Sequence, residues 1–269
     1  RASFALQKEA FERYARKSVN ETYVAAMSII EARYGTAPKL RYFVGFSQGG
    51  KEAMVAAQDH PEDYDGILVG DPVSNLTGLK LAHLQSSGGF YKDGGAGWVS
   101  PELAVIVTKE VYAQCDPLDG VEDGWIANFE GCSPDLSSLL CEADNQENCL
   151  TQAQIDAVNN VARPVELEYE IANGLTGHSG YPWGNVAWQG SFAGSRPQPS
   201  TPAPNVGGND SYVYGLGDGY HRFMIAQDAE AVSLGFDPND ESVRDRIVDV
   251  SSILDATNPD LSPLHARNG

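Results

Sequence analysis

Apolar residues recur at every third or fourth position along the first part of the chain. They predict an amphipathic helix over residues 7–34 that ends at Gly35, since glycine often terminates helices. Residues 40–45 (LRYFVG) and residues 66–70 (GILVG) then form two short β-rich runs. Between them, residues 51–60 have a helical pattern. The order strand, helix, strand predicts a βαβ unit with parallel strands, and therefore an α/β fold.

The pattern changes after Asp71. A Ser-Pro pair begins a predicted helix over residues 100–114, and a Thr-x-x-Gln capping box at residues 151–154 begins another. Residues 173–219 are rich in Gly, Pro, Ser and aromatic residues without a clear period, which predicts a looped surface segment. A last polar helix is predicted over residues 241–255. The chain thus combines part of an α/β sheet with a long irregular insertion.

Composition excludes several function classes. The 269 residues include 37 acidic and 18 basic side chains, which give a formal net charge of −19. A surface this acidic repels nucleic acids and anionic membranes, so we expect neither as a partner. No run approaches the roughly 20 apolar residues that a membrane-spanning helix needs. The sequence therefore predicts an acidic, globular, non-membrane protein.

The four cysteines lie close together, at Cys115, Cys132, Cys141 and Cys149. No two of them have C-x-x-C spacing, and no histidine lies among them, so a zinc site is not indicated. Local disulfides are the better interpretation. Loop length favours the pairs Cys115–Cys132 and Cys141–Cys149.

Three asparagines lie in N-x-[ST] glycosylation motifs: Asn20, Asn75 and Asn209. One such motif occurs often by chance, but three beside paired cysteines favour a secreted, extracellular glycoprotein. The chain begins at Arg1 without a methionine or a signal peptide, so we expect it to be processed or to have lost both ends.

Residues 45–49 (GFSQG) match G-x-S-x-G at the junction between the first predicted strand and the next helix. In enzymes this pattern forms a sharp turn that projects the serine hydroxyl, here that of Ser47, as a nucleophile. The flanking glycines let strand and helix pack without Cβ clashes. The backbone N–H of Gln48 can then donate to a developing oxyanion. The alternative is a glycine-rich turn with an incidental serine.

A nucleophilic serine needs a histidine base and an orienting acid. The five histidines are His60, His83, His178, His221 and His265, and none has the position expected of a triad histidine. The triad is therefore predicted to be incomplete within this sequence.

An acidic loop is the second chemical signal. Asp116, Asp119 and Asp123 lie within eight residues. Their carboxylates, with the backbone carbonyls of Val121 and Trp125, could supply the hard oxygen ligands that Ca²⁺ prefers. The spacing is not that of an EF-hand. A solvated acidic turn without metal is the alternative, and the spacing does not decide between the two.

Several blocks together resemble the tannase and feruloyl esterase family of fungi and bacteria. Residues 41–70 are similar to that family's nucleophile segment, and CDPLDGVEDGWI (115–126) is similar to its structural calcium loop. CLTQAQIDAV (149–158) is similar as well, and the closing ILDATNPDLSPLHARNG resembles the return from lid to sheet. The resemblance implies an α/β-hydrolase core interrupted by a large lid that carries calcium and covers the ester pocket.

The resemblance also implies roles for single residues. Ser47 matches the nucleophile and Gln48 the amide of the oxyanion hole. The calcium ligands would be the side chains of three aspartates and two carbonyls, and the implied disulfides agree with the pairs from loop length. The implied ligands are Asp116, Asp119, Val121, Asp123 and Trp125.

Two departures from the family pattern follow. Members usually carry a cysteine immediately before the nucleophile, bridged to a cysteine beside the catalytic histidine, and here Phe46 stands there. The family's catalytic Asp and His lie beyond the equivalent of Gly269, so the sequence resembles the middle of a longer protein, and a missing segment or a second chain would carry them. The implied division is a core part over 1–71, a lid over 72–255 and a return segment over 256–269.

The sequence therefore predicts a secreted serine carboxylesterase. Ser47 would attack esters of aromatic acids of the feruloyl or galloyl type, free or attached to plant polysaccharide or tannin, and calcium would be structural. The main alternative is a catalytically inactive, calcium-stabilised binding module on the same scaffold. A lipase or serine peptidase shares the elbow but does not predict the calcium loop.

Overall fold

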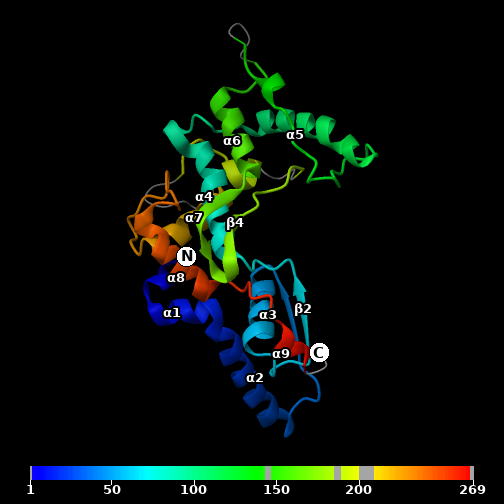
Figure 1. Ribbon diagram of the computed structural model, residues 1–269, viewed down its shortest axis with the longest axis vertical. Coiled ribbons are helices and arrows are strands. Elements are labelled where there is room, and N and C mark those ends of the chain that lie inside the picture. Colours follow the sequence, from blue (N-terminus) through cyan, green and yellow to red (C-terminus); the bar gives the residue numbers. More distant parts are fainter. Residues whose placement is uncertain (1, 143–146, 185–188, 200–208, 267–269) are drawn as a thin grey trace.

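A computed structural model describes residues 2–142, 147–184, 189–199 and 209–266, which form an elongated molecule with two regions (Figure 1). The region at the bottom of Figure 1 holds the parallel strands and is called the elbow region, residues 16–73 and 256–266. The other, called the helical region, comprises residues 2–15 and the described part of 74–255. The chain therefore crosses between the regions three times.

The elbow region is built around the predicted βαβ unit. Strands β1 and β2 pair in parallel, with Tyr42 opposite Gly66 and Phe46 opposite Gly70, and α3 connects them. The βαβ prediction is confirmed. Its elements are the π-helical turn η2 (Arg13–Lys17), which enters from the helical region, and α2 (Ser18–Tyr34), β1 (Tyr42–Phe46), α3 (Gln48–Asp59), β2 (Gly66–Gly70) and α9 (Ser262–His265).

Only one face of this two-stranded sheet is covered within the described residues. Phe43 and Ile67 pack with α3 in a small hydrophobic cluster. Their neighbours along the strands point the other way, as alternation in a strand requires. Val44 is therefore 68% exposed and Leu68 55% exposed.

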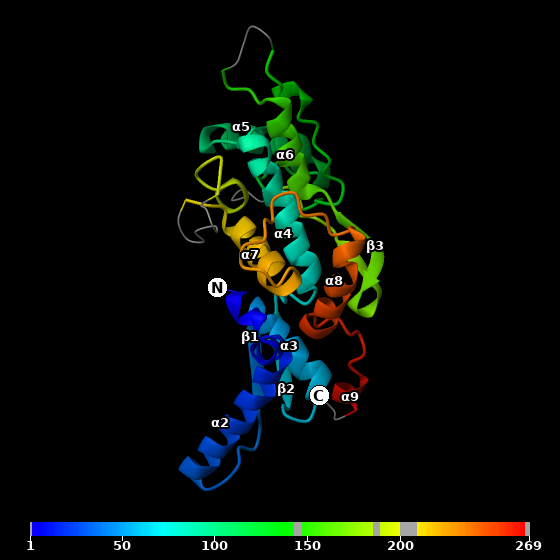
Figure 2. The ribbon, with the colours of Figure 1, turned by 90° about the vertical axis from the view of Figure 1, so that its left-hand side faces the viewer.

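The helical region contains two larger hydrophobic clusters. Helix α4 runs through its centre and contacts α6 and α7, while α8 packs on β3 (Figure 2). The strands β3 and β4 form an antiparallel hairpin. The helices and strands of this region are η1 (Ala2–Leu6), α1 (Lys8–Glu12), α4 (Leu76–Tyr91), η3 (Lys92–Gly94), α5 (Pro101–Cys115), η4 (Asp116–Asp119), η5 (Ser137–Leu139), α6 (Gln152–Ala162), β3 (Val165–Ile171), η6 (Ala172–Gly174), β4 (Leu175–His178), η7 (Gln189–Ala193), α7 (Tyr212–Tyr220), η8 (His221–Ile225) and α8 (Glu241–Leu254).

Local helix signals were reliable guides to helix starts. Ser100 caps α5 by accepting from the Leu103 N–H, with Pro101 in the first turn. Thr151 and Gln154 form the predicted reciprocal capping box of α6. The predicted helix over 7–34 is present as α1, η2 and α2, with the π-helical turn in its course.

The looped surface segment predicted over 173–219 is wrong in part, and the sequence pattern did not reveal α4. The segment contains β4 and most of α7. One of its glycines serves close packing between helices: a Cβ on Gly217 of α7 would lie 2.8 Å from the Leu84 Cγ of α4. Glycine-rich stretches that look like loops therefore form tightly packed helices here.

Candidate active site

Ser47 stands between β1 and α3 in a strained backbone conformation. Its φ is 56° and its ψ is −116°, a region that side chains other than glycine rarely adopt. It occupies the N-cap position of α3 but makes no side-chain cap hydrogen bond. The hydroxyl therefore does not cap the helix, although serine is a favoured capping residue. Strain of this kind is often maintained at functional sites.

Three backbone hydrogen bonds hold the Ser47 turn in place. The Ser47 N–H donates to the Gly70 carbonyl at the end of β2, at 3.1 Å. The Ser47 carbonyl accepts from the N–H of Lys51 at 3.1 Å and from that of Val73 at 3.4 Å. The turn is thus fixed from the neighbouring strand, from its own helix and from the segment that leads to α4.

Close approach at the turn depends on glycine, but not at both positions of the motif. A Cβ on Gly45 would lie 1.9 Å from the Gly49 carbonyl oxygen, and a Cβ on Gly50 would lie 2.5 Å from the Gly70 oxygen. A Cβ on Gly49 would have no described heavy atom within 4 Å beyond its own helix backbone. The expectation that both motif glycines prevent clashes is corrected: Gly50, outside the motif, does what was expected of Gly49.

Gln48 is the first residue of α3. The first N–H groups of a helix have no partner within the helix and carry its positive dipole end, so they can stabilise an anion. The side-chain nitrogen Nε2 of Gln48 is buried and has no hydrogen-bond partner among the described residues. The backbone N–H of Gln48 therefore lies at the positive end of α3, and its role in an oxyanion hole stays a prediction.

Phe46 fills the place where a cysteine was expected from the family pattern. Its side chain is 64% exposed, and its ring lies over Gly70, where a Cβ would come within 2.3 Å of it. The described cysteines are all paired, so none is available for a bridge at this position.

No described histidine is hydrogen-bonded to Ser47. Burial lowers the pKa of His83 to about 2, so this side chain stays neutral. His221 contacts Ser233, with Nδ1 and Oγ 2.8 Å apart, and Ser233 Oγ donates to Asp218 at 2.9 Å. These are the residue types of a catalytic triad. Here, however, the serine lies between the histidine and the aspartate, so the aspartate does not orient the imidazole as it does in a triad. This cluster is structural.

The acidic loop lies at the C-terminal end of α5, inside a disulfide. Cys115 pairs with Cys132 and Cys141 with Cys149, the pairs that loop length predicts. The loop carboxylates accept from their own backbone: Asp119 from the N–H of Val121 at 3.0 Å, and Asp116 from that of Gly124 at 3.0 Å. Trp125, at the end of the loop, is 72% exposed.

One feature of this loop fits a bound cation. The Oδ1 of Asp116 is buried and lacks a hydrogen-bond partner within the described part of the chain. Carboxylate and carbonyl oxygens are the ligands that Ca²⁺ prefers. In the same described ranges, no group of three or more His, Cys, Asp or Glu side chains is close enough to hold a metal. The loop carboxylates would have to turn toward the ion, and the calcium site stays a prediction.

The asparagines of the three glycosylation motifs differ in their exposure and in their hydrogen bonds. Asn209 is exposed. Asn20 donates to Asp63 at 2.9 Å, while Asn75 caps α4 and donates to the Gly177 carbonyl at 2.8 Å. A glycan on Asn75 would displace that donation. Glycosylation at the three sites stays a prediction.

Comparison with known proteins shows that the whole sequence matches one family. The family model described as tannase and feruloyl esterase matches residues 1–269. An uncharacterized esterase of Agrobacterium fabrum is 34% identical over 277 aligned residues, covering 100% of this chain and 49% of that protein. A probable feruloyl esterase B of Aspergillus clavatus is 33% identical over 168 residues, covering 60% of this chain and 31% of that protein. The chain thus spans half or less of these relatives.

Solved structures share the fold. Feruloyl esterase B from Aspergillus oryzae superposes with a TM-score of 0.78 at 23% identity, covering 99% of this chain and 50% of that one. Tannin acyl hydrolase from Aspergillus niger gives a TM-score of 0.64 at 20% identity, covering 98% and 48%. The predicted α/β-hydrolase class is confirmed, with an incomplete sheet. None of the helices in the described ranges is both long and apolar enough to cross a membrane.

Proposed function

The chain belongs to the tannase and feruloyl esterase family, and we propose that it carries the nucleophile of a serine carboxylesterase that hydrolyses esters of aromatic acids. The strained conformation of Ser47, at the junction of β1 and α3, is the observation that supports this most directly. A serine that merely capped the helix would gain nothing from this strain. The family supplies the reaction class, and feruloyl or galloyl esters are the proposed substrates.

In the proposed mechanism, Ser47 Oγ attacks the ester carbonyl carbon while its proton passes to a base. The carbonyl oxygen becomes an oxyanion, which accepts hydrogen bonds from the Gln48 N–H at the positive end of α3. The intermediate collapses, the alcohol leaves with a proton, and the acid remains as an acyl ester on Ser47. Water then hydrolyses this ester, releases the aromatic acid and restores the serine.

The base is proposed to come from outside these 269 residues. The relatives are at least twice as long as the matched region, and within the described residues no histidine is hydrogen-bonded to Ser47. A further segment of the same polypeptide, or a second chain, would bring the histidine and its orienting aspartate. The residues described here contribute the nucleophile, the oxyanion donor and the helical region, which is proposed to act as a lid over the ester.

Calcium is proposed as a structural ion in the acidic loop. Asp116, Asp119 and Asp123 would supply carboxylates, and Val121 and Trp125 carbonyls. The ion would stabilise the loop by binding only the folded state and would take no part in ester cleavage. Two disulfides and the fungal feruloyl esterase relatives support a secreted, extracellular location.

The competing proposal is a catalytically inactive binding module. Phe46 in place of the expected cysteine favours it, as does the lack of a described histidine at Ser47. A module that only binds has no reason to maintain a positive φ at a serine, where glycine would relieve the strain.

Active-site labelling separates the two proposals. The full-length natural polypeptide should react with an organophosphonate at Ser47, and the Ser47→Ala variant should not, as read by mass spectrometry. Parallel assays with feruloyl, galloyl and aliphatic esters should show preference for an aromatic acid. An unlabelled wild-type protein that still binds aromatic esters would support the module instead, and equal rates on aliphatic esters would point to a lipase.

A further inference from the structure

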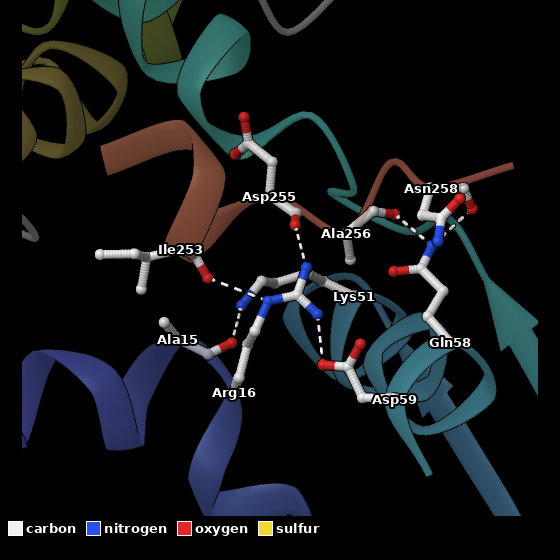
Figure 3. A network of polar contacts seen from close by, with 9 residues as sticks. All are labelled: Ala15, Arg16, Lys51, Gln58, Asp59, Ile253, Asp255, Ala256 and Asn258. Atoms are coloured by element: carbon white, nitrogen blue, oxygen red, sulfur yellow. Dashed lines mark hydrogen bonds and ion pairs between the residues drawn. The ribbon is translucent and has the colours of Figure 1, made fainter. Parts of the chain in front are cut away.

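All three chain crossings between the elbow region and the helical region meet at one joint, and Figure 3 shows residues of the first and the third. The first lies at residues 15–16, the second at 73–74 and the third at 255–256. The second and third are bonded to each other directly, because the Ala256 N–H donates to the Ser74 carbonyl at 2.9 Å. The hydrophobic clusters change at the same places: Ala15 and Leu254 belong to one, and Val19 and Ala256 to another.

Lys51 connects this joint to the nucleophile turn. It lies in the first turn of α3, its backbone N–H donates to the Ser47 carbonyl, and its side chain is 0% exposed. Its Nζ donates to the Ala15 carbonyl at the first crossing (Figure 3). The same atom lies 5.8 Å from the centre of the Tyr14 ring. A lysine is almost never buried so completely without a specific role for its charge.

Arg16 of η2 and Gln58 of α3 hold the third crossing. Arg16 Nε donates to the Ile253 carbonyl at 3.1 Å, and the same guanidinium bonds the Asp255 carbonyl and the Asp59 carboxylate. Gln58 donates to the carbonyls of Ala256 and Asn258, at 3.0 and 2.9 Å (Figure 3). The C-terminal end of the elbow helix is therefore bonded to the segment that follows α8, directly through Gln58 and through Arg16 at Asp59.

Asp255 connects the third crossing to α4. Its carboxylate is 1% exposed and accepts from the Thr77 N–H in the first turn of α4 at 2.8 Å, while its Oδ2 has no partner among the described residues. The carboxylate lies at the positive, N-terminal end of α4. Burial raises the pKa of Asp255 to about 7 and lowers the pKa of Lys51 to about 8. Arg16, Glu52 and Asp59 are the other charged groups that act on Lys51.

We propose that Lys51 and Asp255 are positioning residues that fix the orientation of the helical region over Ser47, and thereby select esters of large aromatic acids. The inference rests on the proposed esterase function. Neither residue needs to touch the ester, because both act through the elbow helix and the first turn of α4. An aromatic acid large enough to reach the helical region depends on this orientation. An acetyl group, which ends near Ser47, does not.

The test compares two substrates on the full-length natural polypeptide. Asp255→Asn removes the charge but keeps the shape and an oxygen for the Thr77 N–H, so it is the variant most able to fold. We expect it to raise KM for a feruloyl ester about tenfold, equivalent to about 1.4 kcal/mol, and KM for a small acetyl ester less than about twofold. Lys51→Met should behave in the same way, and Lys51→Arg should restore most of the wild-type ratio because it keeps the charge.

Asp210→Asn is the matched control. Asp210 is also buried, at 4% exposure, but it pairs with Arg196 inside the helical region, away from the joint. This variant should lower the melting temperature and leave the ratio of the two KM values unchanged. The double variant Lys51→Met/Asp255→Asn should change the ratio by less than the product of the single effects, since both residues act on one joint.

The outcomes are distinguishable. If both esters change by the same factor, or if only the melting temperature falls, the joint is structural and the positioning role is wrong. If Ser47→Ala keeps wild-type activity, the proposed esterase function is wrong, and the positioning role with it. If Asp255→Asn keeps the wild-type ratio of the two KM values while Ser47→Ala is inactive, the positioning role is wrong and the esterase function is not affected.

Discussion

The elbow region and the helical region are stabilised by different means. The turn at Ser47 is set by neighbouring backbone: two glycines without room for a Cβ and three hydrogen bonds to the serine. Its hydrophobic cluster is small, and one face of its sheet carries exposed Val44 and Leu68. The helical region has two large clusters, capped helices and two disulfides. Neighbouring backbone groups thus fix the turn at Ser47, whereas contacts between residues far apart in the sequence stabilise the helical region.

This difference predicts how substitutions in each region affect activity and stability. A change at the elbow alters a backbone conformation that no other contact can restore, so we expect large effects on activity. A change in the helical region removes one of many contacts, so we expect graded effects on stability. The joint formed by Lys51, Arg16 and Asp255 is the place where the two kinds of effect should be coupled.

Ser47→Ala should have the largest effect. Without the nucleophile, kcat/KM for a feruloyl ester should fall by at least about 10⁴-fold. The melting temperature should change little, because the side chain makes no cap hydrogen bond. Steady-state kinetics and thermal unfolding check both parts. Ser28→Ala, an exposed serine of α2, is the control and should keep full activity.

A comparison of Gly45→Ala with Gly49→Ala tests whether the turn at Ser47 depends on a glycine that leaves no Cβ in the way. The first places a Cβ 1.9 Å from a backbone oxygen and should lower the free energy of unfolding by about 3 kcal/mol or more. The second meets no described atom in a helical position and should be neutral or stabilising by up to about 1 kcal/mol. Chemical denaturation measures both. Equal destabilisation would mean that the motif glycines act alike.

Calcium should stabilise the helical region without affecting the elbow. At about a hundred times its Kd, Ca²⁺ should add about 2–3 kcal/mol to the free energy of unfolding, and chelation should reverse this. Asp116→Asn should abolish the effect, whereas Glu122→Gln in the same loop should keep it. Thermal unfolding with and without chelator checks this. A chelated protein with unchanged melting temperature but no kcat would contradict a structural ion.

Stability should depend on pH through the joint. The pKa of Asp255 is raised to about 7, so the native state holds this proton more tightly than the unfolded chain does. Its contribution is full below about pH 4 and is lost as the pH rises to about 7. Asp255→Asn should therefore flatten the curve by up to about 4 kcal/mol across this range, since each unit of pKa difference is worth about 1.4 kcal/mol. Denaturation at several pH values measures it, and an unchanged slope would show that Asp255 titrates normally.

Thr151→Ala should give the smallest effect. It removes one side of the capping box of α6 and should cost about 1 kcal/mol of unfolding free energy, with activity unchanged. Thr151→Ser keeps the acceptor and should restore most of this. A loss of activity at wild-type stability would mean that α6 contributes to the site.

Several features were predictable because they depend on neighbours in sequence. Gly45 and Ser47 mark the elbow, Thr151 and Gln154 mark a helix start, and Cys115 lies close enough to Cys132 to make their disulfide the simple choice. The role of Gly50 was also signalled, by the Gly-Gly pair at residues 49–50, but the motif drew attention to Gly49. Whether the acidic loop binds calcium stays a prediction.

Other features depend on residues far apart in the chain, and no sequence pattern contains them. Gly217 looks like a loop residue until α4 is placed against it, and Lys51 looks like a solvated lysine until Tyr14 and Ala15 pack against it. The sequence alone determined the βαβ unit, the strained turn at Ser47 and the helix caps, because short-range sterics and hydrogen bonds specify them. Tertiary structure decided which glycines separate helices and which charges are buried, because burial is set by long-range packing that sequence distance does not reveal.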